Sequence, residues 1–168
     1  VRNPRRVRSG LRVVSSIETR WHRFGLPFFF HPSSNHRLGM AKPQAIRDLL
    51  NGPVNSIPTP FLIDGQIDWQ GVRNIIEVGI SGGSSVSLLT YGDSQYDHLS
   101  DDEVTELTRC LVDQVRGRAL TVAATRRWPN DKAVDFARLC REVDIDVLMV
   151  LPSDHATPKG KIEHYRAV

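Results

Sequence analysis

Apolar and polar positions in residues 54–168 follow two alternating patterns, one typical of strands and one typical of helices. Short apolar runs, the length of buried strands, occur at 54–62, 84–90, 120–125 and 147–151. After each run, apolar residues recur every three or four positions, as they do on the buried face of a helix. Successive strands begin about 30 residues apart. This order predicts a parallel sheet with helices packed outside it, and therefore an α/β fold.

Polar caps and glycines mark the ends of the predicted helices. Ser100 and Glu103 have the spacing of a capping box, in which each side chain bonds the backbone N–H of the other residue. Gly79 is the predicted stop of the preceding helix, and Asn130 or Asp131 is the predicted cap of the following one. The predicted helices cover residues 43–51, 68–79, 100–115, 130–143 and 159–165.

Charge divides the chain at about residue 40. The first forty residues hold eight arginines and a single acid, Glu18, and so carry +7, which leaves −4 for the remainder of a chain with net charge +3. We predict a domain at residues 40–168 and a basic leader at residues 1–39. The leader has three readings: disordered or mis-translated upstream sequence, an organelle transit peptide, or a nucleic-acid-binding arm. We expect the first of these, and therefore no nucleic-acid partner.

The cysteines and histidines give no sign of a metal site or a disulfide framework. Cys110 and Cys140 fall among apolar neighbours in predicted helices, so we expect packed, reduced thiols. The six histidines lack the spacing of metal ligands, so we predict no metal, and we expect no cofactor. No apolar run approaches the ~20 residues of a membrane span. We therefore expect no membrane partner and a cytoplasmic protein.

Polar residues follow the predicted strands, at the end where parallel α/β proteins place their active sites. These residues are Asp93, Ser94, Gln95, Arg126, Arg127, Asp154 and His155. A cluster of this kind suits a small carboxylated substrate, with Arg126 or Arg127 as the partner of the anion. The alternative is that these side chains are ordinary solvated loop tips.

Four motifs together resemble one enzyme family. Thr-Pro-Phe at 59–61 followed by Asp-Gly-Gln-Ile-Asp at 64–68 is similar to the first βα unit of the dihydrodipicolinate synthase and N-acetylneuraminate lyase group. Segments 99–103, 146–152 and 162–165 resemble its later helix starts and its fourth strand. The resemblance covers about residues 45–168. It implies a class I aldolase fold, namely the N-terminal half of a (β/α)8 TIM barrel with about four βα units, truncated, because a complete barrel needs roughly 250 residues.

The resemblance also implies which positions form the site. In the family, a Gly-Thr-Thr-Gly-Glu loop after strand 2 positions the substrate carboxylate, and a tyrosine after strand 4 relays protons. Residues 91–95 align with that loop, which places Gly92 and Asp93 at the two hydroxyl positions, or Ser94 after a small local shift. Asp154 stands at the position of the tyrosine. We therefore predict Gly92, Asp93 and Ser94 as substrate-binding residues and Asp154 as the catalytic residue.

Two departures from the family limit the expected activity. Family members form a Schiff base between pyruvate, or a related 2-oxo acid, and a lysine on the sixth strand. The lysines of this chain, at 42, 132, 159 and 161, fall on predicted helices or loops, and none is assigned that role. In addition, Asp93 would repel a substrate carboxylate unless a cation or a different substrate intervenes.

These observations predict a divergent, truncated member of the family. Its parent activity is Schiff-base aldol condensation or cleavage of a small 2-oxo acid. We expect the 168-residue chain by itself to be inactive in that reaction. Two alternatives stay open: a non-catalytic binding or scaffold protein, and a non-functional fragment. A half barrel would expose two strand edges, so self-association or pairing with a second half is expected, and the full-length protein would be a homo-oligomer.

Overall fold

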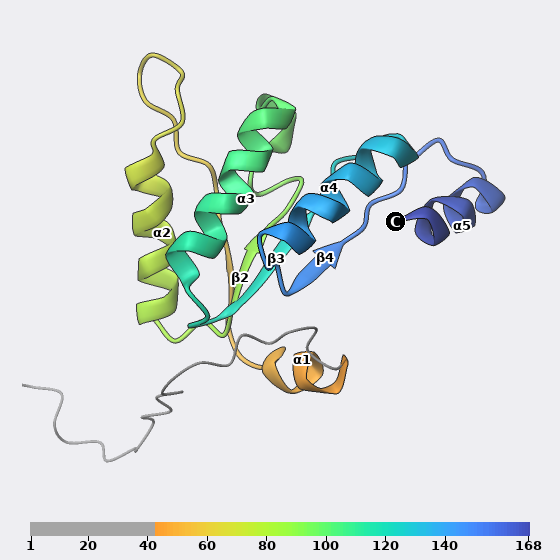
Figure 1. The fold of residues 1–168 in the computed structure, drawn as a ribbon. Helices are drawn as coiled ribbons and strands as arrows, with labels where there is room; N and C mark the ends of the chain where they lie inside the picture. Colours follow the sequence, from red (N-terminus) through yellow and green to blue (C-terminus); the bar gives the residue numbers. More distant parts are fainter. Residues whose placement is uncertain (1–42) are drawn as a thin grey trace, which may run out of the picture. The chain divides into compact units, whose positions relative to one another are not determined.

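The computed structural model describes residues 43–168 (Figure 1). The predicted leader, residues 1–39, lies outside the described residues, as do residues 40–42 of the predicted domain. Along the described part the elements are α1 (Pro43–Leu49), β1 (Val54–Ser56), α2 (Trp69–Ser81), β2 (Val86–Leu89), a short 3-10 helix (Tyr96–His98), α3 (Asp101–Val115), β3 (Leu120–Ala124), α4 (Asn130–Glu142), β4 (Val147–Met149) and α5 (Pro158–Ala167).

The four strands form one parallel sheet in the order β1-β2-β3-β4. Val86 of β2 pairs with Val54 on one side and with Leu120 on the other, while Ala124 of β3 pairs with Met149 of β4. Each strand is joined to the next by a segment that contains a helix, as parallel neighbours require. The predicted parallel sheet with alternating helices is therefore confirmed.

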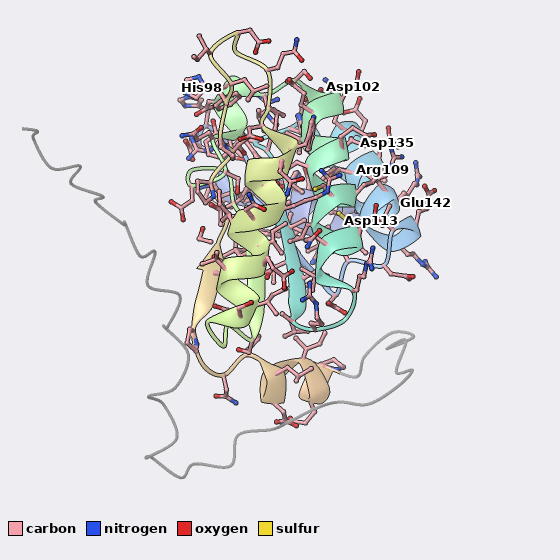
Figure 2. The ribbon with its side chains drawn as sticks, turned by 90° about the vertical axis from the view of Figure 1, so that its left-hand side faces the viewer. His98, Asp102, Arg109, Asp113, Asp135 and Glu142 are labelled. Atoms are coloured by element: carbon pink, nitrogen blue, oxygen red, sulfur yellow. The ribbon has the colours of Figure 1, made fainter. Side chains whose placement is uncertain are left out.

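The main hydrophobic core lies between the sheet and helices α2, α3 and α4. Strand residues Leu89 and Ala123 belong to the same buried cluster as Ile76 of α2, Leu107 of α3 and Phe136 of α4. A fully buried leucine or isoleucine side chain contributes roughly 1.5–3 kcal/mol relative to an exposed one. The opposite faces of α3 and α4 are charged, as Figure 2 shows for the exposed side chains of Asp102, Arg109, Asp113, Asp135 and Glu142.

A smaller cluster covers the other face of the sheet. Its buried members are Val86, Leu120 and Val122, and Ile46 of α1 packs against them. Because side chains alternate along a strand, these residues face away from Leu89 and the three outer helices. The short helix α1 thus covers part of the second face.

The edges of the sheet are open within residues 43–168. In this part of the chain β1 and β4 each pair with one neighbouring strand. The side chain of Val54 on β1 is 54% exposed and that of Met149 on β4 is 38% exposed. Unpaired strand edges with exposed apolar residues favour pairing with further strands.

Two predicted helix ends differ from the observed ones. Helix α2 does not stop at Gly79 but continues to Ser81, with Gly82 as its C-cap. Gly79 has a different role, since a Cβ there would lie 2.0 Å from the Nδ2 atom of Asn55. The glycine therefore lets α2 approach the side chain of β1 closely.

The predicted cap of α4 is also wrong, whereas the capping box of α3 is confirmed. The N-cap of α4 is Pro129, which offers no side-chain cap, and the amide oxygen of Asn130 instead lies 2.7 Å from Nδ1 of His164 on α5. In α3 the Ser100 hydroxyl accepts from the Glu103 N–H, and the Glu103 carboxylate accepts from the Ser100 N–H. Tertiary contact thus overrides local capping at one helix start and leaves it intact at the other.

The first strand is shorter than the predicted 54–62. It ends at Ser56, and Pro58 and Pro60 follow, which lack the N–H group that a ladder bond needs.

Cys110 and Cys140 are buried free thiols, as expected, and burial raises the pKa of both. In the described residues no helix is long and apolar enough to cross a membrane, and no three His, Cys, Asp or Glu side chains gather as a metal site would require.

Candidate functional site

The loop after β2 is fixed to the end of β1 by one buried residue, Ser94. Its hydroxyl donates to the carbonyl oxygen of Ile57 at 2.7 Å and accepts from the N–H of Thr90 at 3.0 Å. The Ser94 carbonyl oxygen in turn accepts from the Thr59 hydroxyl at 2.7 Å. Ser94 has no exposed surface. The Ser94 hydroxyl therefore holds the loop in place through two hydrogen bonds to the backbone.

The neighbouring residues, Gly92 and Asp93, are exposed at the carboxyl end of the sheet. The Asp93 carboxylate accepts from the hydroxyl of Ser56, the last residue of β1, at 2.5 Å. A Cβ at Gly92 would meet nothing within 4 Å, so that position has room for a larger side chain. These two residues thus present one carboxylate and one open space at the end of β1 and β2.

Asp154 is joined to the loops after β2 and β3 through Arg127. The Asp154 carboxylate accepts from Nη1 of Arg127, and the Arg127 guanidinium carbon lies 5.0 Å from the ring centre of Tyr91. The Tyr91 hydroxyl donates to the Asp97 carboxylate, and this hydrogen bond is the main reason that the pKa of Tyr91 is raised. Three loops far apart in sequence are connected by this series of contacts.

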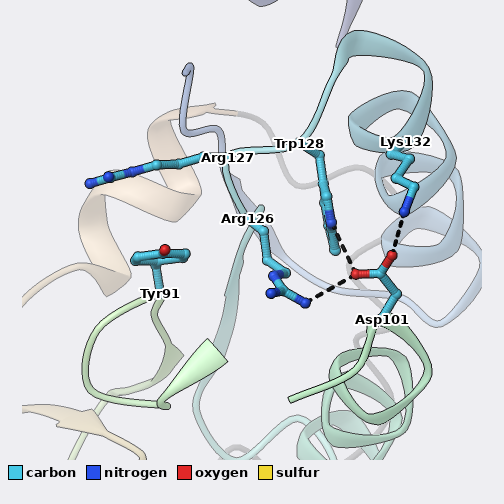
Figure 3. Close-up of a pocket in the computed structure, with 6 residues that line it drawn as sticks. All are labelled: Tyr91, Asp101, Arg126, Arg127, Trp128 and Lys132. Atoms are coloured by element: carbon cyan, nitrogen blue, oxygen red, sulfur yellow. Dashed lines mark hydrogen bonds and ion pairs between the residues drawn. The ribbon is translucent and has the colours of Figure 1, made fainter. Parts of the chain in front are cut away.

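A pocket of about 310 Å³ lies beside these contacts, between the starts of α3 and α4 (Figure 3). Its lining residues are Tyr91, Asp101, Arg126, Arg127, Trp128 and Lys132. All six side chains are charged or aromatic, and the loop after β3 supplies three of them in succession. The pocket therefore combines polar contacts with aromatic surface.

Asp101 organises one side of the pocket. Its Oδ1 accepts from Nη1 of Arg126 and from Nε1 of Trp128, each at 3.1 Å, and its Oδ2 accepts from Nζ of Lys132 at 2.6 Å. The hydrogen bond from Lys132 is the main cause of a lowered pKa at Asp101. Arg126 also donates to the carbonyl oxygen of Leu99 at 2.9 Å. The three donors are thereby held in defined positions around one carboxylate.

The structure gives the predicted residues different partners. Arg127 and Asp154 form an ion pair, Arg126 lines the pocket, and the Asp93 carboxylate accepts from Ser56 at the end of β1. His155 is exposed.

Four lining residues of the pocket were missed by sequence reasoning: Tyr91, Asp101, Trp128 and Lys132. The available signal was topological, since the helix starts after β2 and β3 meet at the same edge of a parallel sheet. Asp101 and Lys132 stand in the first turns of those two helices. Because β2 and β3 are neighbouring parallel strands, the helices that follow them begin close together, and so do Asp101 and Lys132.

Comparisons with known proteins identify 4-hydroxy-tetrahydrodipicolinate synthases as relatives of this chain. No protein-family model matches the sequence. Among curated proteins, the 4-hydroxy-tetrahydrodipicolinate synthase of Methylococcus capsulatus is 31% identical over 124 residues, which is 71% of this chain and 42% of that protein. The synthase of Polynucleobacter asymbioticus is 26% identical over 130 residues, 76% of this chain and 42% of its own length. The chain thus spans about two fifths of the curated relatives that it matches.

Solved structures show the same relationship. A 4-hydroxy-tetrahydrodipicolinate synthase from Methylacidiphilum fumariolicum SolV superposes with a TM-score of 0.65 at 21% identity, over 70% of this chain and 40% of that one. A dihydrodipicolinate synthetase described as putative, from Pseudomonas aeruginosa, gives 0.64 at 28% identity, over 71% and 42%. These neighbours are TIM barrels, and the predicted architecture is confirmed: the four βα units correspond to the N-terminal half of a (β/α)8 barrel.

Proposed function

The chain belongs to the dihydrodipicolinate synthase family, and on that premise we propose that it supplies the first four βα units of a lyase acting on a pyruvate-like 2-oxo acid. The observation that carries the proposal is the position of Gly92, Asp93 and Asp154. All three lie on loops that follow strands of the sheet, where (β/α) barrels bind substrate. In this proposal they line the substrate position, and Ser94 holds the loop that carries Gly92 and Asp93.

The imine-forming lysine of such a lyase is not among the described lysines of this chain. Lys132 is in the first turn of α4 and its ammonium pairs with Asp101, while Lys159 and Lys161 are on α5. A Schiff-base lysine needs a neutral, desolvated amine, and these three lie on helices and not on a strand. The chain therefore contributes substrate-positioning loops, and the imine forms on a residue from a later strand.

Asp93 and Asp154 make the proposed site more negatively charged than the corresponding site of the family. Where the family has hydroxyl groups and a phenol, this chain has two carboxylates, one beside Ser56 and one paired with Arg127. Asp154 is the proposed proton-transfer group, at its carboxylate oxygens. Asp93 weakens binding of a substrate carboxylate by like-charge repulsion. The same replacements favour a second candidate function, a non-catalytic binding protein that keeps the fold.

The experiment that tests the proposal is borohydride trapping of the pyruvate imine, read by intact mass. The 168-residue chain alone gives no adduct. Mixed with the C-terminal four βα units of the Methylococcus capsulatus relative, it gives an adduct on that half, well above the level of the half alone. An adduct on this chain alone would contradict the assignment of the lysine. An adduct no greater than with the half alone would favour the non-catalytic function.

A matched pair of variants then tests Asp93. Asp93→Asn removes the carboxylate next to the proposed substrate position, and we expect severalfold less pyruvate to be needed for half-maximal adduct. Asp102→Asn removes another exposed carboxylate, in the first turn of α3, and is expected to leave the requirement unchanged. Equal effects of the two substitutions would assign the change to net charge and not to the site.

A further inference from the structure

The loop after β2 uses its backbone N–H groups internally. The N–H of Asp93 donates to the Thr90 hydroxyl at 3.1 Å, and the N–H of Ser94 donates to the Thr90 carbonyl oxygen at 3.2 Å. The next two N–H groups along the chain donate to the carbonyl oxygens of Gly92 and Tyr91. Loops that bind anions present successive backbone N–H groups to the anion. In this loop four successive N–H groups already have partners within the loop.

The hydroxyl groups around the loop also donate to the protein itself. The Ser56 hydroxyl donates its single proton to Oδ2 of Asp93 at 2.5 Å. The buried hydroxyls of Ser94 and Thr59 donate to the carbonyl oxygens of Ile57 and Ser94. A hydroxyl group binds a carboxylate only by donating its proton to it. These three hydroxyls therefore have no proton left for a carboxylate ligand.

The end of β1 and the loop after β2 thus offer acceptors to a ligand. Within residues 43–168, Oδ1 of Asp93 has no recorded partner, and the Ser56 oxygen keeps its lone pairs. None of the ion pairs among the described residues includes Asp93. Gly92, next to Asp93 in the chain, leaves room for a ligand, since a Cβ there would meet nothing within 4 Å.

A hydroxyl group of a ligand suits these acceptors, whereas a carboxylate group does not. A carboxylate beside Asp93 meets a like charge and finds no donor in place of the water that it loses. A hydroxyl group donates to Asp93, and hydrogen bonds to an ionised acceptor are stronger than those between neutral groups. Because Asp93 is exposed, water screens its charge, so an ammonium group gains little over a hydroxyl group.

We propose that the site takes a hydroxyketone, in which a hydroxymethyl group stands where pyruvate has its carboxylate, in preference to the 2-oxo acid. Asp93 accepts from the hydroxyl group of the substrate, and Ser56 holds the Asp93 carboxylate in position. This inference rests on the proposed function, because it concerns the substrate of the same Schiff-base site. It changes the group that is recognised beside the carbonyl carbon and leaves the chemistry at that carbon unaltered.

The test compares hydroxyacetone with pyruvate, two methyl ketones that differ only in that group. Each is titrated into the 168-residue chain mixed with the C-terminal four βα units of the Methylococcus capsulatus relative. The ketone oxygen leaves as water when the lysine nitrogen of that half forms the C=N bond, and borohydride then adds hydride to the carbon of this bond. Intact mass measures the reduced adduct. We expect half-maximal adduct at a severalfold lower concentration of hydroxyacetone than of pyruvate.

Variants of the loop should affect the two ketones in opposite directions. Asp93→Asn raises the hydroxyacetone requirement severalfold, because a neutral amide oxygen is a weaker acceptor, and lowers the pyruvate requirement. Ser56→Ala releases the Asp93 carboxylate and also raises the hydroxyacetone requirement. Asp102→Asn, in the first turn of α3, leaves both requirements unchanged. Far-UV circular dichroism confirms that each variant is folded.

A failure of this inference differs in outcome from a failure of the proposed function. If neither ketone gives an adduct above the level of the C-terminal half alone, the function is refuted and the inference with it. If pyruvate gives half-maximal adduct at the same concentration as hydroxyacetone or a lower one, the function stands and the preference for a hydroxyl group is wrong. The same conclusion follows if Asp93→Asn shifts both requirements in one direction.

Discussion

Two buried serines, Ser94 and Ser87, provide a direct test of how the candidate site is held together. Both have no exposed surface. The Ser94 hydroxyl makes two hydrogen bonds, to the Ile57 carbonyl oxygen and from the Thr90 N–H. The Ser87 hydroxyl, on β2, has no hydrogen-bond partner in the described structure. The same substitution, serine to alanine, should therefore have very different effects at the two positions.

The expected magnitudes follow from the partners that are left behind. Ser94→Ala deprives the Ile57 carbonyl and the Thr90 N–H of their partner, and each unsatisfied buried group costs about 1–3 kcal/mol. We expect the free energy of unfolding to fall by about 2–4 kcal/mol. Ser87→Ala removes a buried hydroxyl that makes no bond, so its effect should lie within about 0.5 kcal/mol or be stabilising.

The assay is equilibrium unfolding in urea, followed by far-UV circular dichroism. A loss of stability at Ser94 appears as a lower midpoint with an unchanged slope, because the surface exposed on unfolding is the same. Ser87→Ala is the matched control, since it removes the same atom from another fully buried serine. Similar midpoints for the two variants would refute the reasoning, because they would show that the two hydrogen bonds of Ser94 do not stabilise the loop.

Three further predictions concern the rest of the domain. The hydrogen bond from the Arg118 guanidinium lowers the pKa of Glu77 from 4.5 to about 2. Glu77→Gln should therefore lower the free energy of unfolding above pH 4.5, and this difference from the unsubstituted protein should vanish as the pH falls to about 2. Urea midpoints of both proteins across that pH range measure the difference. Asn130→Ala removes the hydrogen bond to His164 and should lower the free energy of unfolding by about 1 kcal/mol in the same assay. Burial raises the pKa of Cys140 to about 12, so its thiol should resist iodoacetamide at pH 8 in the folded protein and react in urea, as peptide mass mapping will show.

Local sequence signals predicted the elements of the fold well because most of those signals act over three or four residues. The capping box of Ser100 and Glu103 is one such signal, and it is present in the structure. Gly79 was wrongly predicted to end the helix. A glycine is needed there because the side chain of Asn55, on β1, leaves no room for a Cβ. Asn130 was misread as a cap because its amide bonds His164, a residue 34 positions away.

The site was less predictable than the fold, for the same reason. Position relative to the strands correctly placed Asp93 and Asp154 at the carboxyl end of the sheet. Sequence could not reveal that Arg127 pairs with Asp154 or that Lys132 and Arg126 share Asp101, since these partners are at least 25 residues apart in the chain. Sequence placed Ser94 in this loop but could not show that it is fully buried, because burial is a tertiary property.

The sequential strand order has a consequence for how the protein forms. Because β1, β2, β3 and β4 lie side by side in the order in which they are synthesised, each strand after β1 finds one neighbour already present when it leaves the ribosome. The principal helix contacts are likewise between consecutive helices, α2 with α3, α3 with α4 and α4 with α5. Contacts between near neighbours in sequence form quickly. The sheet can therefore grow one unit at a time during translation, with the loop held by Ser94 completed before α4 exists.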